Sequence, residues 1–157
     1  WTNPPVAWMM HAGISKMLDQ DLIFPAHNYP ISVDKVYDNF IKKNNKDRLF
    51  KIALEAYPAL TARLITKKSY KSDEKKKQNS ERLSCRKAIL QGLVNDEVGL
   101  NLKLLISRKM SRMLLQDGKG DFLDSTICML QASSSILRKN FGISKSVDPL
   151  EGWIICS

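Results

Sequence analysis

The chain has 157 residues, enough for one domain with a buried core, and 43% of them are hydrophobic against 26% charged. This ordinary globular composition contains no apolar run of ~18 residues, so it excludes a membrane-spanning helix and predicts a soluble protein. Lys and Arg number 25 against 16 Asp and Glu, and the formal charge of +9 favours polyanionic partners without naming one.

The N-terminal part of the chain predicts two helices joined by a loop. Pro4 and Pro5 can stand in a first helical turn, and apolar residues then recur at helical spacing as far as Leu18. Residues 23–30 contain two prolines and no period, which predicts an extended loop. Ser32 can cap a second helix that runs to Ile41 and ends in a polar stretch.

Residues 50–54 are short and largely apolar, which predicts a strand, and a helix is expected to begin near Pro58 and run through Ile65. Glu55 follows this strand directly. A carboxylate at the C-terminal end of a strand is well placed for function, because open α/β sheets bind ligands there. The alternative is a residue at the rim that pairs with a lysine.

A basic cluster occupies the next part of the chain. Residues 69–73 predict a polar turn, and Asn79 or Ser80 can cap a helix whose apolar residues leave Arg82, Arg86 and Lys87 on another face. The cluster fits contact with a phosphate backbone or, alternatively, a solvated and mobile face. Its members are Lys67, Lys68, Lys71, Lys75, Lys76, Lys77, Arg82, Arg86 and Lys87.

Two further helices are predicted after the basic cluster. Apolar spacing from Leu102 to Leu114 indicates the first, and residues 117–120 form a loop that leads to the second, an acidic helix. Asp121 and Asp124 are three residues apart, so they share one face of that helix. Carboxylates near a helix N-terminus gain ~0.3–1 kcal/mol from the helix dipole. A bound cation is the other explanation for their position. Residues 153–156 can form a short strand or an extended tether.

Cysteine and histidine offer no metal site or disulfide framework. Cys85, Cys128 and Cys156 are an odd number at wide spacings, without a Cys-x-x-Cys pair. His11 and His27 lack metal-ligand spacing, so we expect ordinary surface or hydrogen-bonded histidines. This usage predicts a reducing, cytoplasmic location.

A single strand leaves its backbone donors and acceptors unpaired and cannot form a sheet. The chain starts with Trp1 rather than Met, and no signal peptide is visible. We therefore expect residues 1–157 to be one incomplete domain whose missing strands precede Trp1.

Four motifs resemble the family called domain of unknown function 429, which is regarded as a predicted nuclease with the ribonuclease-H-like fold. The likeness covers nearly the whole chain. The motifs are Leu54-Glu-Ala-Tyr-Pro-Ala-Leu, Ser69-Tyr-Lys-Ser-Asp, Gly120-Asp-Phe-Leu-Asp-Ser and Val147-Asp-Pro-Leu-Glu-Gly-Trp-Ile.

The resemblance implies an α/β fold, of which this chain would be the mostly helical C-terminal part with one or two short strands. It also implies a divalent-metal site built from an aspartate on a missing first strand, from Glu55, and from Asp121 and Asp124. Carboxylates suit Mg²⁺ or Mn²⁺, and two such ions ~3.5–4 Å apart would activate water and stabilise the leaving oxygen of a phosphodiester. Without its first aspartate the chain alone would be inactive.

Other residues take smaller expected roles. Lys71, Arg82 and Arg86 are predicted phosphate contacts. Asp73 is expected to cap a turn, with assistance to the metal site as the alternative. Residues Asp148, Glu151 and Trp153 are expected to dock the C-terminal tail, and a fourth metal ligand is the other possibility.

The leading hypothesis is a metal-dependent ribonuclease-H-like nuclease that hydrolyses nucleic-acid phosphodiesters. A nucleic-acid-binding module without catalysis shares the basic cluster but needs no metal. A phosphate-handling or ligand-sensing protein is a third hypothesis, because one fold hosts many functions.

Overall fold

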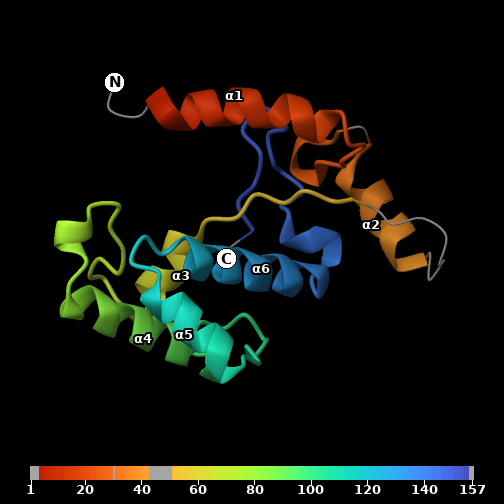
Figure 1. The fold of residues 1–157 in the computed structure, drawn as a ribbon. Helices are drawn as coiled ribbons and strands as arrows, with labels where there is room; N and C mark the ends of the chain where they lie inside the picture. The colour runs from red at the N-terminus through yellow and green to blue at the C-terminus, as the bar shows by residue number, and fades with distance from the viewer. Residues whose placement is uncertain (1–3, 30, 43–50, 156–157) are drawn as a thin grey trace. The chain divides into compact units, whose positions relative to one another are not determined.

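The computed structural model describes residues 4–29, 31–42 and 51–155, and within these ranges the chain is mostly helical with almost no strand (Figure 1). The chain folds into two compact units, which are described separately. The first unit comprises residues 1–55 and 143–153, and the second comprises residues 56–142 and 154–157. None of the described helices is long and apolar enough to cross a membrane.

Both helices predicted in the first unit are confirmed. They are α1 (Pro4–Leu18) and α2 (Val33–Lys42). The predicted loop between them contains a short 3-10 helix, η1 (Pro25–His27), which packs against α2. Val33 and Val36 are buried three residues apart on α2, as the amphipathic pattern of that helix requires.

The predicted strand at residues 50–54 is wrong within the described residues 51–54; Phe50 lies outside them. Ile52 forms only an isolated parallel bridge with Ile23. The Ile23 N–H donates to the Lys51 carbonyl at 2.8 Å, and the Ala53 N–H donates to the Ile23 carbonyl at 2.8 Å. A β-strand needs backbone hydrogen bonds to a neighbouring strand along its length. This extended segment pairs with its neighbour at one residue only, so no β-ladder forms.

Four α-helices and two 3-10 helices build the second unit. They are α3 (Pro58–Ile65), η2 (Lys75–Lys77), α4 (Ser80–Asn95), α5 (Arg108–Gln116), α6 (Asp121–Ile136) and η3 (Lys139–Gly142). Helix α3 packs against α4 and α6, and α5 also packs against α4 and α6. The predicted start of α3 at Pro58 and the predicted Asn79 cap of α4 are confirmed, since the Asn79 side chain accepts from the Arg82 N–H.

The core of the second unit comes from apolar side chains at helical spacing. On α6, Leu123, Ile127 and Leu130 recur four and three residues apart and are almost fully buried. The full buried cluster is Ala62, Tyr70, Cys85, Ile89, Leu90, Leu93, Leu100, Leu104, Leu114, Leu123, Ile127 and Leu130. This core fixes the helices on which the candidate site lies.

The helix predicted over residues 102–114 is correct only in its second half. Helix α5 begins at Arg108, after Ser107 accepts from the Met110 N–H as the N-cap. Residues 102–107 have no regular secondary structure, and Asn101, directly before them, has a positive φ of 57°. Leu104 is nevertheless buried, so the apolar spacing reflects a loop that lines the core.

Candidate functional site

The loop before α6 leads into the acidic first turn of the helix and packs closely against a neighbouring segment. Gly120 is the N-cap residue with a φ of 78°, and a Cβ atom there would lie 2.8 Å from the Lys71 Cβ. Asp117 accepts from the Phe122 N–H at 2.9 Å and so satisfies a backbone donor of the first turn. Asp121 is exposed, and no other described residue forms a hydrogen bond or ion pair with its carboxylate.

Asp124 has two partners from the segment before η2. The Tyr70 hydroxyl donates to Asp124 Oδ1 at 2.6 Å, and the Lys71 ammonium forms an ion pair with Oδ2. Burial, followed by the hydrogen bond to Asp124, raises the pKa of Tyr70 well above its ordinary value. Burial is also the main reason that the pKa of the neighbouring Cys128 thiol is raised. The negative charge of the partly buried Asp124 carboxylate is therefore balanced by a hydrogen bond and an ion pair.

Glu55 belongs to the first unit, where its partner is a histidine rather than a lysine. His27 Nε2 lies 2.6 Å from Glu55 Oε1, and Nδ1 lies 2.7 Å from the Pro149 carbonyl oxygen. Both partner atoms are oxygens that can accept a hydrogen bond from the ring. Asp148 accepts from the Leu150 N–H at 2.8 Å and shapes the turn that presents Pro149. His27 thus ties the 143–153 segment to residues 1–55.

The predicted metal ligands do not form a metal site within either unit. Glu55 lies in the first unit, whereas Asp121 and Asp124 lie in the second. Among the residues that the structure describes, no three His, Cys, Asp or Glu side chains form a group that could hold a metal ion. The dipole explanation fits Asp121 at the first helical position, and Lys71 supplies the positive charge beside Asp124. Metal binding stays a prediction.

The three predicted phosphate contacts all have intramolecular partners. Lys71 pairs with Asp124, and the Arg82 guanidinium donates to the Lys77 carbonyl. The sequence predicts Arg86 on a different face of α4 from the apolar residues, whereas the structure buries Arg86, which is only 4% exposed. Helix α5 and the segment at Tyr70 cover it, because the guanidinium donates to the Leu115 carbonyl at 3.0 Å and the Tyr70 carbonyl at 2.7 Å. Burial lowers the pKa of Arg86, and nearby Asp117 opposes that change.

A pocket of about 520 Å³ opens between the start of α4 and helix α5, wholly within the second unit. Three cations line it, Arg86, Lys87 and Arg112, together with the apolar side chains of Leu83 and Leu115. No Asp or Glu is among the described residues that line it. We call it the basic pocket.

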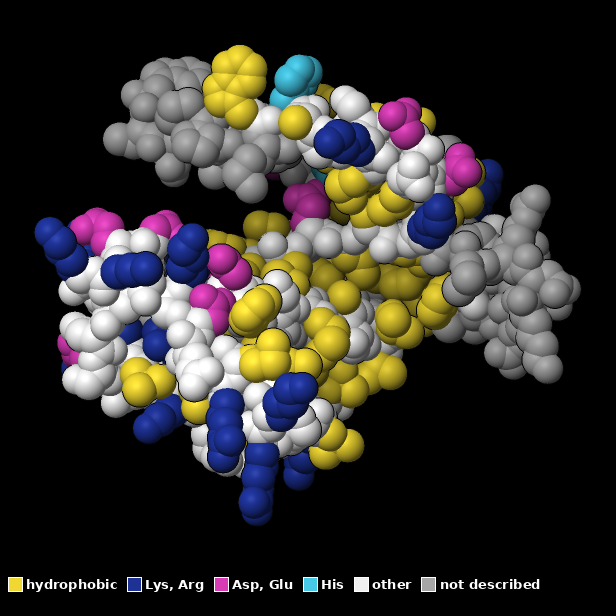
Figure 2. All heavy atoms as spheres, viewed as in Figure 1, with side chains coloured by type: hydrophobic (Ala, Val, Ile, Leu, Met, Phe, Trp, Pro, Cys, Tyr) yellow, Lys and Arg dark blue, Asp and Glu magenta, His cyan; other side chains and the backbone are white. Residues whose placement is uncertain are grey.

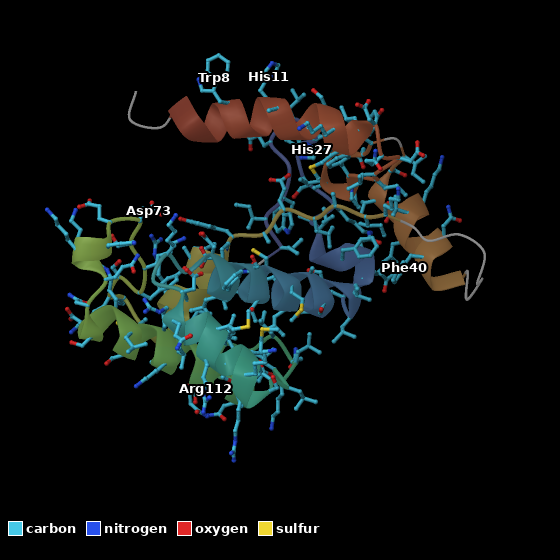
Figure 3. The ribbon with its side chains drawn as sticks, viewed as in Figure 1. Trp8, His11, His27, Phe40, Asp73 and Arg112 are labelled. Carbon is cyan, nitrogen blue, oxygen red and sulfur yellow. The ribbon has the colours of Figure 1, made fainter. Side chains whose placement is uncertain are left out.

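Sequence reasoning missed Arg112, which is exposed on α5 (Figure 3). Arg108, Lys109 and Arg112 are three and four residues apart, so they share one face of that helix. Figure 2 shows Lys and Arg side chains gathered over α4 and α5. The spacing of these three cations was the available signal. The predicted helix began at Leu102, and its apolar pattern obscured this basic face.

The remaining predicted residues have structural surroundings. Asp73 is exposed just before η2, and none of the described residues forms a hydrogen bond or ion pair with it (Figure 3). Glu151 is exposed and Trp153 is half-buried in the first unit. Cys85 and Cys128 are free thiols, and Cys156 lies outside the described residues.

Comparison with known proteins found no matching family model, no matching curated protein and no matching solved structure.

Proposed function

We propose that this protein is a nucleic-acid-binding module whose second unit contacts the phosphate backbone. The observation that supports this function best is the distribution of charge. The second unit contains 17 Lys and Arg and 8 Asp and Glu, a difference of +9 that equals the formal charge of the whole chain. The first unit contains 8 of each kind and is formally neutral.

Many of these cations are available to an external partner. Eleven are exposed, and their side chains have no hydrogen bond or ion pair with any described residue: Arg63, Lys67, Lys75, Lys76, Lys87, Lys103, Arg108, Lys109, Arg112, Lys119 and Lys139. Cations that neutralise phosphates release condensed counterions, which is the main source of sequence-independent nucleic-acid affinity. An excess of unpaired cations on one unit supports this mode of binding.

A charge-matched comparison tests the proposal. The triple variant Arg108→Gln, Lys109→Gln, Arg112→Gln removes three exposed cations of α5, and the control Lys16→Gln, Lys35→Gln, Lys145→Gln removes three exposed cations of the first unit. We expect fluorescence anisotropy with single-stranded oligonucleotides to show that the α5 variant binds more weakly. Its slope of log affinity against log salt should also fall by about 2.

The control should bind almost as the unaltered protein does, because its cations lie in the neutral unit. Absence of oligonucleotide binding at low salt would reject the proposal. So would equal losses of affinity in the two triple variants, because the binding would then follow total charge rather than a surface of the second unit.

A metal-dependent ribonuclease-H-like nuclease, as in the family that the motifs resemble, is the second candidate. The observation that favours it is the first turn of α6, where Asp121 is exposed and unpaired among the described residues and Asp124 lies one turn along. Mg²⁺ or Mn²⁺ is the cation that such oxygen ligands suit. A cation at Asp124 would have to compete with Lys71.

Metal titration separates this candidate from simple binding. A ligand that binds only the folded state stabilises it by about 2.7 kcal/mol at a concentration of 100 Kd. The nuclease hypothesis expects Mg²⁺ or Mn²⁺ to raise the melting temperature, and Asp121→Asn to reduce that rise. It also expects metal-dependent cleavage of single-stranded, hybrid or branched substrates. An unchanged melting temperature together with intact substrates would leave only the binding function.

A further inference from the structure

We propose that the basic pocket binds a phosphate monoester, supplied either by the terminal phosphate of a nucleic-acid strand or by a free nucleotide. This inference rests on the proposed nucleic-acid-binding function and names the chemical group that one part of the surface recognises. It requires three things of the pocket: concentrated positive charge, hydrogen-bond donors without acceptors, and room for the attached nucleoside.

The charge requirement is met by the lining. Arg86, Lys87 and Arg112 come from two helices and converge on one cavity that no described Asp or Glu lines. A phosphate monoester carries about −1.5 to −2 charge at neutral pH, more than the single charge of an internal phosphodiester. A cluster of three cations therefore discriminates in favour of the monoester, and a pocket receives a chain end more readily than a continuous strand.

Unused donors are present on Arg86. Its Nε and Nη1 atoms donate to the carbonyls of Leu115 and Tyr70, which hold the side chain in place, whereas Nη2 has no partner among the described residues. The side chain is only 4% exposed and yet lines the cavity. A buried guanidinium with free N–H groups that faces a pocket is fixed in orientation, and phosphate oxygens are strong acceptors for it.

The start of α4 adds partial positive charge to the same cavity. Asn79 and Ser80 line the pocket, and the first turn of this 16-residue helix leaves backbone N–H groups without helical partners. Glu81, the acid of that turn, forms an ion pair with Lys68 at 2.8 Å and does not line the pocket. Asp117 lies close enough to influence Arg86 but is also absent from the lining.

The volume and the apolar walls accommodate more than a phosphate. A cavity of about 520 Å³ lies within the ~300–1,000 Å³ range of small-molecule sites. Leu83 and Leu115 provide apolar surface on which a sugar or a base can lie. The same geometry therefore fits a terminal nucleotide or a free one.

The variants that test this inference avoid the buried arginine, whose loss would disturb folding. Lys87 and Arg112 are exposed, so Lys87→Gln and Arg112→Gln remove pocket charge without opening the core. Arg108→Gln is the matched control for Arg112, because it lies on the same helix, is exposed and does not line the pocket. Lys103→Gln, also exposed, is the control for Lys87.

The probes are one oligothymidylate with a 5′-phosphate, a 3′-phosphate or hydroxyl ends, and thymidine monophosphate as competitor. We expect one of the phosphorylated oligomers to bind about tenfold more tightly than the hydroxyl form, the factor expected for one added charged hydrogen-bonded group. Arg112→Gln and Lys87→Gln should abolish that preference, and the two controls should keep it. Competition by thymidine monophosphate at similar concentrations identifies a free nucleotide as the ligand, and its failure identifies a strand end.

Two results would overturn the inference. One is equal affinity for phosphorylated and hydroxyl oligomers together with no binding of thymidine monophosphate, and the other is an equal loss of preference in Arg108→Gln and Arg112→Gln. Salt-dependent binding of the hydroxyl oligomer in either case would leave the general nucleic-acid-binding function standing. Absence of binding to every oligomer, with thymidine monophosphate still bound, would instead reject that function while the pocket remained a monoester site.

Discussion

Tyr70 and Lys71 are consecutive residues that approach one carboxylate, Asp124, from a different segment of the second unit. The pair accounts for a partly buried acid on α6 without a metal. A hydrogen bond to a charged group contributes about 1.5–3 kcal/mol, and Tyr70 is itself buried. We expect Tyr70→Phe to lower the free energy of unfolding by about that amount at neutral pH.

The contribution of Tyr70 should also depend on pH. Its pKa is raised in the folded state, so the contribution is complete below the unfolded pKa of about 10 and is lost as pH rises above that value. Urea unfolding from pH 7 to 11 should therefore show the difference between the unaltered protein and Tyr70→Phe shrinking above about pH 10. Tyr57→Phe is the matched substitution in the same unit, at a tyrosine that is 39% exposed. A constant difference across the range would contradict the assignment.

The sequence predicted the place of Arg86 in a basic cluster but not its burial. Its position in a basic cluster was visible in the sequence, and so was the capping residue Asn79. Its burial was not, because the covering groups are carbonyls of Leu115 and Tyr70, 29 and 16 residues away. Main-chain acceptors carry no side-chain signature, so no pattern of residue types identifies them.

Among the elements, the turn at residues 148–152 depends on a glycine. Gly152 has a φ of 76°, and a Cβ atom there would lie 2.3 Å from Glu55 Oε1 and 2.7 Å from His27 Cε1. We expect Gly152→Ala to lower the thermal stability of the first unit, since it strains the backbone by roughly 1–2 kcal/mol and displaces the His27–Glu55 pair.

Gly13→Ala provides the matched control in the same unit. Gly13 lies inside α1 with no atom within 4 Å of a new Cβ, so alanine there should raise stability by about 0.5–1 kcal/mol. Calorimetry of both variants should give shifts of opposite sign. A stable Gly152→Ala variant that retains the contact between His27 and Pro149 would show that the turn tolerates a side chain.

Local signals predicted most of the helical elements. Pro4, Pro58 and Ser32 indicated helix starts, and the apolar spacing of α6 indicated its buried face. The prediction of a strand at residues 50–54 was wrong because an extended segment becomes a β-strand only when it pairs with a neighbour. Ile23 pairs with this segment at one residue only. The prediction was wrong for the first half of the 102–114 helix because these residues form a loop that lines the core. Apolar residues in such a loop can recur at helical spacing although the loop is not helical.

At the scale of the molecule, the sequence revealed the sign and size of the charge but not its distribution. The basic cluster at residues 67–87 was visible, yet the equal numbers of acidic and basic residues in the first unit become meaningful only when the boundaries at residues 55 and 143 are known. The pocket could not be predicted for the same reason, since its lining joins the start of α4 to α5 across the packing of two helices.

Confinement of the excess charge to one unit has a consequence for folding itself. Like charges repel, so the second unit folds against its own electrostatic field, whereas the formally neutral first unit does not. A polyanion, or simply a concentrated electrolyte, relieves this repulsion where it exists. The basic unit should thus be most firmly folded when it is occupied, and its vacant form is the one most exposed to unfolding.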